Sequence, residues 1–266
     1  MVVGLTFTLQ KLKIMTEKLS KPGEFLGTNE VHLGLTTRCN LACPFCARTT
    51  EKNRWFGKGN IDLDITHYKS FIALSKIETI LLCGNYGDPI FYPHLFELLE
   101  YAKLHDIIIK MHTNGSGHNI TWWKKLAEIL TKKDRIFFSI DGIESNFTTY
   151  RIGAKWDKIL ENINIINTVT NHPRLVWKYI LFKYNEDTIL DAVNIAKNLG
   201  MDSVMLQRPW VPKNKEGIEH LPGMSNYKQK DWMPSFNPKE FIINNKLISN
   251  NIYKLEEDAL YIKVSS

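Results

Sequence analysis

The chain places three of its four cysteines in one stretch of eight residues, Cys39-Asn-Leu-Ala-Cys43-Pro-Phe-Cys46, directly downstream of the apolar run 31–35. We expect the apolar run to form a strand and the cysteines to lie in the loop at its carboxyl end. Active sites of parallel α/β proteins are built at that end of the sheet. The crowding of thiols therefore predicts a metal or cluster site at this sheet edge.

Short apolar runs alternate with amphipathic stretches along the middle of the chain. The runs expected to be strands cover residues 31–35, 79–83, 107–111, 135–140, 175–182 and 203–207. The stretches expected to be helices cover residues 65–75, 93–105, 121–130, 156–169 and 187–199, the last closed by Gly200. Strand then helix, five times over and ending in a sixth strand, predicts a parallel sheet with right-handed crossovers. The predicted fold class is α/β, a partial (β/α)6 open barrel.

The predicted barrel covers residues 31–208, and the flanking segments do not continue its alternation of strands and helices. Residues 1–30 are expected to be peripheral. Five of the ten prolines fall between residues 208 and 238, which predicts an irregular covering segment. An apolar stretch at 241–248 and a strand-like run at 259–264 complete the predicted C-terminal part, residues 209–266.

Composition narrows the class of protein. With 266 residues, 44% hydrophobic and 23% charged, the chain is long enough for one large α/β domain and is not a disordered sequence. No apolar run approaches the roughly 18 residues that a membrane helix needs, so we expect a cytoplasmic protein with no membrane partner. The net charge is +6, but the 27 lysines and 7 arginines are scattered, so no specific nucleic-acid partner is indicated.

Three thiolates in one loop can hold several kinds of centre. A structural zinc needs a fourth ligand, and the candidates Cys83, His67 and His94 stand in no CxxC or HxxxH arrangement. A cubane iron–sulfur cluster suits three thiolates, with one iron left open for a substrate or cofactor. A disulfide or a group of buried free thiols fits the polar, three-cysteine motif less well. Cys83, which ends an apolar run, is predicted to be a small buried hydrophobe.

The CxxxCxxC spacing, with Phe45 before the last cysteine, resembles the signature of the radical S-adenosylmethionine (SAM) enzymes. Further segments match in order. Gly84-Asn-Tyr-Gly-Asp-Pro89 resembles the family's Gly-Gly-Glu-Pro segment, with Tyr86 and Asp88 as departures from it. Thr113-Asn-Gly115 and Ser139-Ile-Asp-Gly142 are similar to segments of the subgroup that contains the molybdopterin-precursor cyclase and the SPASM/Twitch peptide maturases.

The resemblance implies a role for each matching residue. Cys39, Cys43 and Cys46 would hold a 4Fe–4S cluster whose fourth iron chelates SAM. The segment Tyr86, Gly87, Asp88 and Pro89 would bind the amino group of SAM, and Arg151 would bind its carboxylate. Ser139 and Asp141 would contact the ribose, and Phe45 and the backbone at Leu206 would contact the adenine. Asn114 of the Thr-Asn-Gly segment would lie beside these contacts. Simple structural roles are the alternative: Asp88 as a helix cap, Asp141 in a turn, Arg151 as a solvated side chain.

The implied activity is reductive cleavage of SAM to a 5′-deoxyadenosyl radical, which abstracts hydrogen from an unidentified substrate, with a peptide favoured. An external one-electron donor, flavodoxin- or ferredoxin-like, is the implied partner. Two other classes stay open: a non-enzymatic iron–sulfur or zinc-binding module, and a degenerate SAM-binding relative, which the departures at Tyr86 and Asp88 suggest.

The C-terminal part sets a further expectation. Relatives in the subgroup often carry a SPASM or Twitch extension whose cysteines hold auxiliary clusters, whereas no cysteine follows Cys83 in this sequence. We therefore expect a single cluster. Residues 260–264 resemble the strand that opens such an extension, so the chain is interpreted as a shortened or split relative, with the auxiliary domain encoded separately.

Overall fold

The computed structural model describes residues 29–50, 59–74, 77–84, 86–210, 226–238, 252–255 and 259–264. Residues 1–28 of the predicted peripheral segment, residues 211–225 of the proline-rich segment and the apolar stretch 241–248 lie outside these residues. Among the described residues no helix is long and apolar enough to cross a membrane.

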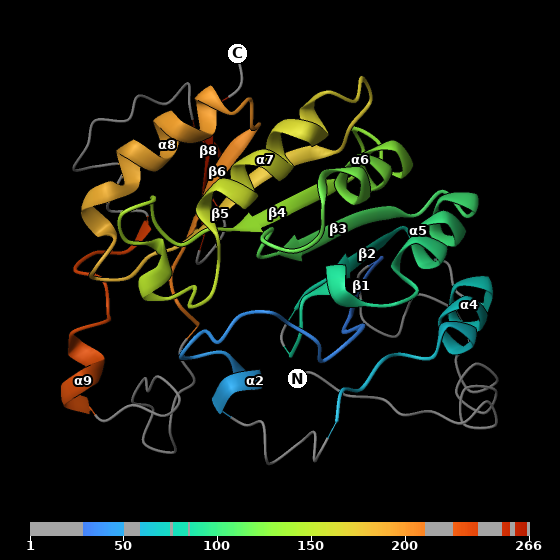
Figure 1. The fold of residues 1–266 in the computed structure, drawn as a ribbon, viewed down its shortest axis with the longest axis horizontal. Coiled ribbons are helices and arrows are strands. Elements are labelled where there is room, and N and C mark those ends of the chain that lie inside the picture. The colour runs from blue at the N-terminus through green and yellow to red at the C-terminus, as the bar shows by residue number, and fades with distance from the viewer. Residues whose placement is uncertain are drawn as a thin grey trace.

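An eight-stranded sheet forms the centre of the molecule, with the order β1-β2-β3-β4-β5-β6-β8-β7. Its first six strands run parallel and lie side by side in chain order (Figure 1). They are β1 (Glu30–Leu33), β2 (Thr79–Leu82), β3 (Ile108–Thr113), β4 (Arg135–Ser139), β5 (Arg174–Ile180) and β6 (Ser203–Gln207). The six predicted strands and the parallel open sheet are thus confirmed.

Two antiparallel strands extend the sheet beyond the predicted six. β8 (Ala259–Lys263) pairs with β6, and β7 (Ile252–Leu255) pairs with β8. The strand-like run at 259–264 is therefore a strand, but it joins the sheet of the barrel itself. β6 consequently has a neighbour on each side.

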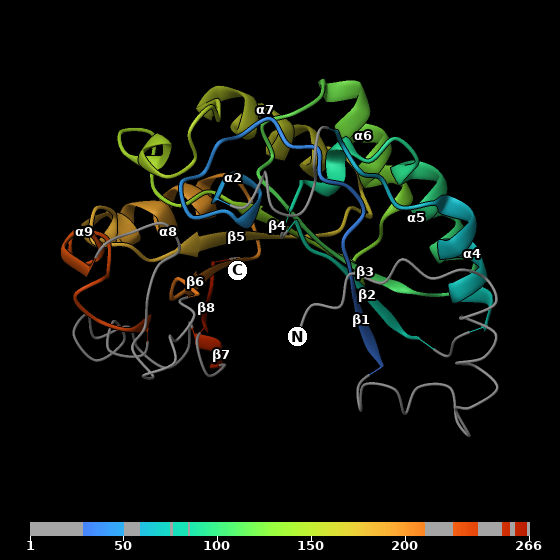
Figure 2. The same ribbon diagram turned by 90° about the horizontal axis from the view of Figure 1, so that it is seen from below.

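Helices connect the parallel strands on one side of the sheet. Figure 2 shows the sheet as an arch with α4, α5, α6 and α7 along its outer face. The helices are α2 (Ala47–Thr50), α4 (Ile65–Leu74), α5 (Leu95–Leu104), α6 (Ile120–Ile129), α7 (Trp156–Asn167), α8 (Ile189–Asn198) and α9 (Asn226–Lys230), with the 3-10 turns η1 (Pro89–Phe91), η2 (Phe147–Thr149) and η3 (Glu186–Thr188). The five predicted helices are confirmed, and Gly200 follows α8 with the left-handed φ of 69° that a helix end favours.

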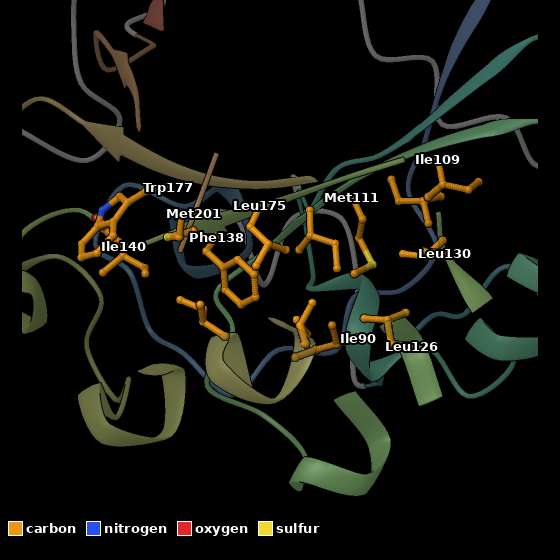
Figure 3. Packing of buried hydrophobic residues seen from close by; sticks show 14 of the residues in the cluster. Ile90, Ile109, Met111, Leu126, Leu130, Phe138, Ile140, Leu175, Trp177 and Met201 are labelled. Atoms are coloured by element: carbon orange, nitrogen blue, oxygen red, sulfur yellow. The ribbon is translucent and has the colours of Figure 1, made fainter. Parts of the chain in front are cut away.

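The main core lies between the outer face of the sheet and the helices. Alternate residues of each strand point into it, among them Ile109 and Met111 of β3, Phe138 of β4 and Trp177 of β5. Leu126 and Leu130, at the end of α6, belong to the same cluster (Figure 3). The intervening residues of these strands must face the concave side, because successive side chains of a strand alternate. A smaller apolar cluster on that side contains Phe137, Val176, Met205, Ala259 and Tyr261.

Candidate active site

The cysteine stretch forms the loop between β1 and the short helix α2, and several hydrogen bonds hold the loop in place. The amide of Ala42 donates to the carbonyl of Ile152 at 3.0 Å. The guanidinium of Arg48, in α2, donates to the carbonyls of Thr37 at 2.9 Å and Leu41 at 3.2 Å. These bonds fix the path of the loop and with it the positions of the three thiols.

The three predicted ligands lie in one cluster with aromatic and aliphatic side chains. Cys43 is buried, whereas Cys39 and Cys46 are partly exposed, and all three are free thiols. The side-chain amide of Asn114 donates to Cys39 Sγ at 3.8 Å, and Nη1 of Arg151 donates to Cys43 Sγ at 3.7 Å. Residues from the ends of β3 and η2 therefore meet the cysteine loop at the carboxyl edge of the sheet.

The chemistry of this donor set fits an iron–sulfur cluster. Burial and the nearby Asp88 raise the pKa of Cys39 to about 11, and burial raises the pKa of Cys43, so both stay protonated until a cation replaces the proton. Within the described residues no group of three or more His, Cys, Asp or Glu side chains is arranged around one metal ion. A 4Fe–4S cube takes each thiolate on a different iron and needs no such convergence. N–H groups directed at the sulfurs also suit bound thiolates.

The turn after β2 packs directly on the start of the cysteine loop. A Cβ atom on Gly87 would lie 2.1 Å from the carbonyl oxygen of Thr36 and 2.8 Å from that of Arg38. The amide of Asp88 donates to the carbonyl of Arg38 at 2.8 Å. Glycine at position 87 is thus required for the close approach of two backbones. Tyr86 is partly exposed and Pro89 is buried beside them.

Asp88 is almost completely buried, and its carboxylate already has partners. Oδ1 accepts from the amide of Ile90, the first turn of η1, at 3.2 Å. Oδ2 accepts from the Thr113 hydroxyl at 3.1 Å and the Asn114 amide at 2.7 Å. Burial raises the pKa of Asp88 to about 6, although these hydrogen bonds oppose the shift. The carboxylate therefore caps η1 and joins the ends of β2 and β3.

Arg151 and Asp141 form a buried pair next to Cys43. Nε of Arg151 donates to Oδ2 of Asp141 at 2.6 Å, and Oδ1 of Asp141 accepts from the amide of Ile180, the last residue of β5, at 2.6 Å. Burial raises the pKa of Asp141 against the lowering effect of Arg151. The side chain of Arg151 is 15% exposed, so it is an oriented and largely buried cation, not a solvated side chain, and Asp141 fixes its orientation.

The predicted adenine and ribose contacts lie in different surroundings. Phe45 is part of an aromatic group, with ring centroids 4.9 Å from Trp232 and 5.7 Å from Tyr150. Ser139 is buried on the concave face of β4, opposite Lys178 of β5. Leu206 is the last residue but one of β6, with its side chain in the main core and Tyr179 and Leu260 beside it in the neighbouring strands.

Two asparagines that hold the site together were not among the predicted site residues. Asn40, inside the cysteine stretch, accepts from Asn114 Nδ2 at 3.0 Å and donates to the Ser116 hydroxyl at 3.1 Å. Asn185, fully buried after β5, donates to the carbonyl of Asp141 at 3.1 Å. Proximity to the cysteines in sequence could have pointed to Asn40. The role of Asn185 depends on contacts 44 residues apart and follows only from the fold.

Comparison with curated proteins finds relatives of this chain. It is 23% identical over 245 residues to the "Tungsten-containing aldehyde ferredoxin oxidoreductase cofactor-modifying protein" of Pyrococcus furiosus, across 88% of this chain and 62% of that protein. It is 27% identical over 188 residues to a "GTP 3',8-cyclase" of Syntrophomonas wolfei, across 64% of this chain and 52% of that protein. The chain thus spans about half to three fifths of the length of these two relatives.

A solved structure and a family profile agree with these relatives. The structure of Streptococcus suis SuiB bound to S-adenosylmethionine superposes with a TM-score of 0.55 at 17% identity, covering 89% of this chain and 49% of that chain, which supports the fold. The profile described as "Radical SAM superfamily" matches residues 33–171, which include the cysteine loop, Asp88, Asn114 and Arg151. Members of that family use a 4Fe–4S cluster and SAM. The chain belongs to the radical SAM superfamily.

Proposed function

We propose that this protein is a radical SAM enzyme in which Cys39, Cys43 and Cys46 hold one 4Fe–4S cluster. The observation that carries the proposal is the meeting of these cysteines with Asn114 and Arg151 at the carboxyl edge of the parallel sheet. When bound, the reduced cluster supplies the electron that cleaves SAM to methionine and a 5′-deoxyadenosyl radical, which abstracts a hydrogen atom from the substrate.

Arg151 is proposed to bind the carboxylate of SAM. Its Nε is engaged by Asp141 and its Nη1 points at Cys43, so the guanidinium is held rigidly beside a cluster ligand. A guanidinium has five N–H groups, and those that remain suit a carboxylate in a fork geometry. Asp141 is proposed to act through Arg151, because both of its carboxylate oxygens have protein partners.

The segment from Tyr86 to Pro89 is proposed to receive the amino group of SAM. The Asp88 carboxylate is occupied by Ile90, Thr113 and Asn114, so backbone carbonyls of this turn are the better acceptors for an ammonium group. The shorter Asp88 thus serves to anchor the turn. An aspartate can therefore replace the glutamate of the Gly-Gly-Glu-Pro pattern, because the backbone binds the amino group and the carboxylate anchors the turn.

The remaining SAM contacts follow from the position of each residue at the same edge. Ser139 is proposed for the ribose, since it ends β4 two residues before Asp141. Phe45 is proposed to contact the adenine as part of its aromatic group with Tyr150 and Trp232. The backbone near Leu206 is proposed for the adenine edge, at the carboxyl end of β6.

Substrate, partner and domain organisation are further parts of the proposal. The names of the relatives cover cofactor modification and GTP cyclisation, and one neighbour of similar fold was solved with its precursor peptide. A peptide substrate and a flavodoxin- or ferredoxin-like electron donor are the proposals here. A separately encoded auxiliary domain is proposed as a further partner of the barrel, residues 31–208.

The test is anaerobic reconstitution with iron and sulfide, followed by reduction with dithionite and assay for 5′-deoxyadenosine. We expect about four irons per chain and formation of 5′-deoxyadenosine from SAM. Cys46→Ala should lose the cluster and the product together. An intact cluster without product would reject the catalytic proposal in favour of an iron–sulfur module or a degenerate relative, and clearly more iron would reject a single cluster.

A further inference from the structure

The concave face of the sheet carries a lysine and a histidine that the proposed SAM site does not use. Lys178 lies in β5 between Trp177 and Tyr179, and His112 lies in β3 between Met111 and Thr113. Trp177, Tyr179 and Met111 point into the main core. Lys178 and His112 therefore point to the opposite, concave face of the sheet.

These two side chains meet across β4. Nζ of Lys178 lies 3.2 Å from Nδ1 of His112. The imidazole packs on Phe137 of the intervening strand, with ring centroids 4.4 Å apart, which fixes the ring. Because lysine can only donate, Nδ1 accepts and the ring proton sits on Nε2. The pair thus offers an ammonium group and an imidazole N–H from a fixed support.

The charge of Lys178 has no carboxylate at ion-pair distance within the described part of the chain. Lys110, on the same face, differs in this respect because its Nζ lies 2.5 Å from Glu30 Oε2. The nearest acidic influence on Lys178 is Asp141, which is committed to Arg151 and the Ile180 amide. A partly buried cation without a counterion is costly unless a ligand supplies the opposite charge.

The pKa values of Lys178 and His112 agree with an excess of positive charge around the pair. Burial lowers the pKa of Lys178 to about 8, and Arg151 adds to the shift. Burial has the largest effect on His112, followed by the charges of Lys178, His32, Arg151 and Lys110, and together they hold its pKa well below the usual value. A bound anion would relieve both shifts.

The pair also lies close to the proposed SAM site. Two residues beyond Lys178 along β5, the amide of Ile180 donates to Asp141, which in turn binds Arg151 beside Cys43. Two residues of a strand span roughly 7 Å. On the same face the apolar cluster of Phe137, Val176 and Met205 borders the pair. A ligand held at Lys178 would therefore reach toward the reacting end of the sheet.

We propose that Lys178 and His112 bind an anionic oxygen group of the substrate, a carboxylate or a phosphate, on the concave face of the sheet. The proposal rests on the proposed function, because the anion is taken to be part of that enzyme's substrate. Binding of the anion itself requires neither SAM nor a reduced cluster. Its test is therefore separate from the 5′-deoxyadenosine assay, and either can fail alone.

The experiment titrates the reconstituted full chain with inorganic phosphate, and in a parallel arm with acetate, by calorimetry at constant ionic strength. We expect binding of at least one anion, with Lys178→Gln weakening it by about tenfold or more, as loss of a charge-assisted hydrogen bond implies. Lys178→Arg should stay within about threefold of the wild type, because it keeps the charge. Lys110→Gln is the matched control on the same face and should also stay within about threefold, since Glu30 already neutralises Lys110.

The two arms distinguish the chemistry, because phosphate alone or acetate alone would identify the group. A second measurement uses the unmodified protein, so it does not depend on the folding of variants. Phosphate or acetate should slow acylation of Lys178 at least threefold relative to the exposed Lys133, read by peptide mass spectrometry. No binding of either anion, or equal loss in Lys178→Gln and Lys110→Gln, would overturn the proposal.

Discussion

Asn114 joins the end of β3 to the cysteine loop through a side-chain amide whose orientation is fixed. Its Oδ1 accepts from the amide and the hydroxyl of Ser116, at 2.9 Å and 2.7 Å. The NH2 group must therefore point the other way, toward Cys39 Sγ and Asn40 Oδ1. Hydrogen bonds to cluster sulfurs stabilise the more negative, reduced state and raise the reduction potential.

Asn114→Ala should therefore lower the reduction potential of the bound cluster. A difference of about 1 kcal/mol in hydrogen-bond energy between the two oxidation states corresponds to roughly 40 mV for a one-electron couple. Potentiometric titration followed by electron paramagnetic resonance measures it. Ser116→Ala, which leaves the N–H donor on Asn114, should shift the potential by less than half as much. Equal potentials in the wild type and Asn114→Ala would contradict this role.

Lys178 should titrate far below an ordinary lysine. Its pKa near 8 reflects burial, with His112, Cys83, Asp141 and Arg151 as the surrounding titratable or charged groups. Because the folded pKa lies below the ~10.4 of a free lysine, the folded chain binds fewer protons between about pH 8 and 10. Lys178 therefore lowers the free energy of unfolding most below pH 8, and this destabilisation decreases as the pH rises from about 8 to 10.

Two measurements follow from this pKa. Acylation of Lys178 should reach half its maximal rate at about pH 8, whereas acylation of free lysine in solution, with a pKa of about 10.4, should still be rising above pH 9. Phosphate binding should weaken from pH 7 to pH 9, since the neutral amine loses its charge. A Lys178 profile that parallels that of free lysine would show that the ammonium is not destabilised in the fold.

At the scale of elements, the site depends on the contact between the turn after β2 and the loop after β1. The two segments meet backbone to backbone at Gly87, and the Asp88 amide bonds to Arg38. Asp88 then links this turn to β3 through Thr113 and Asn114. Three consecutive strand ends are thus fixed to one another before any cofactor binds.

Gly87→Ala should separate these elements. The new methyl group would lie 2.1 Å from the Thr36 carbonyl, which is backbone and cannot yield cheaply. We expect a loss of roughly 3 kcal/mol of unfolding free energy, as for other overpacked sites, together with a fall in bound iron. Gly34→Ala is the control, because nothing lies within 4 Å of its Cβ position. Urea unfolding and iron analysis of both variants check the expectation.

At the scale of the whole molecule, the C-terminal strand is part of the barrel sheet. Leu260 and Ile262 of β8 are fully buried in the main core, and Leu260 stands opposite Leu206 of β6. β8 covers the edge that β6 would otherwise leave open, and an open edge invites association with other chains. The last described residues therefore stabilise the fold that carries the site.

Leu260→Ala should cost about 2–5 kcal/mol of stability, the range for a leucine removed from a packed core. Lys263→Ala, in the same strand but exposed, should cost less than about 0.5 kcal/mol. Denaturant unfolding of both variants makes the comparison. If the two variants were equally stable, β8 would be a loosely attached strand and not part of the core.

The order of strands and helices was predictable because it depends on local periodicity. Runs such as Thr79–Leu82 and Ser203–Gln207 carry their apolar pattern in a few neighbouring residues. The pairing of β8 with β6 was not predictable in the same way, since it joins residues more than fifty positions apart. Antiparallel addition to an edge depends on which edge the fold leaves free.

For the candidate site, the sequence by itself determined the spacing of the three thiols proposed as ligands, because their positions within one loop are a local property that no distant contact can alter. It also placed Gly87, Asp88 and Asn114 after the ends of strands. Only the tertiary structure decided what these groups do to one another: Asp88 caps η1, Asp141 holds Arg151, and Lys178 meets His112 across β4. Strand register and burial set those contacts and charges, and both arise from the packing of the whole sheet.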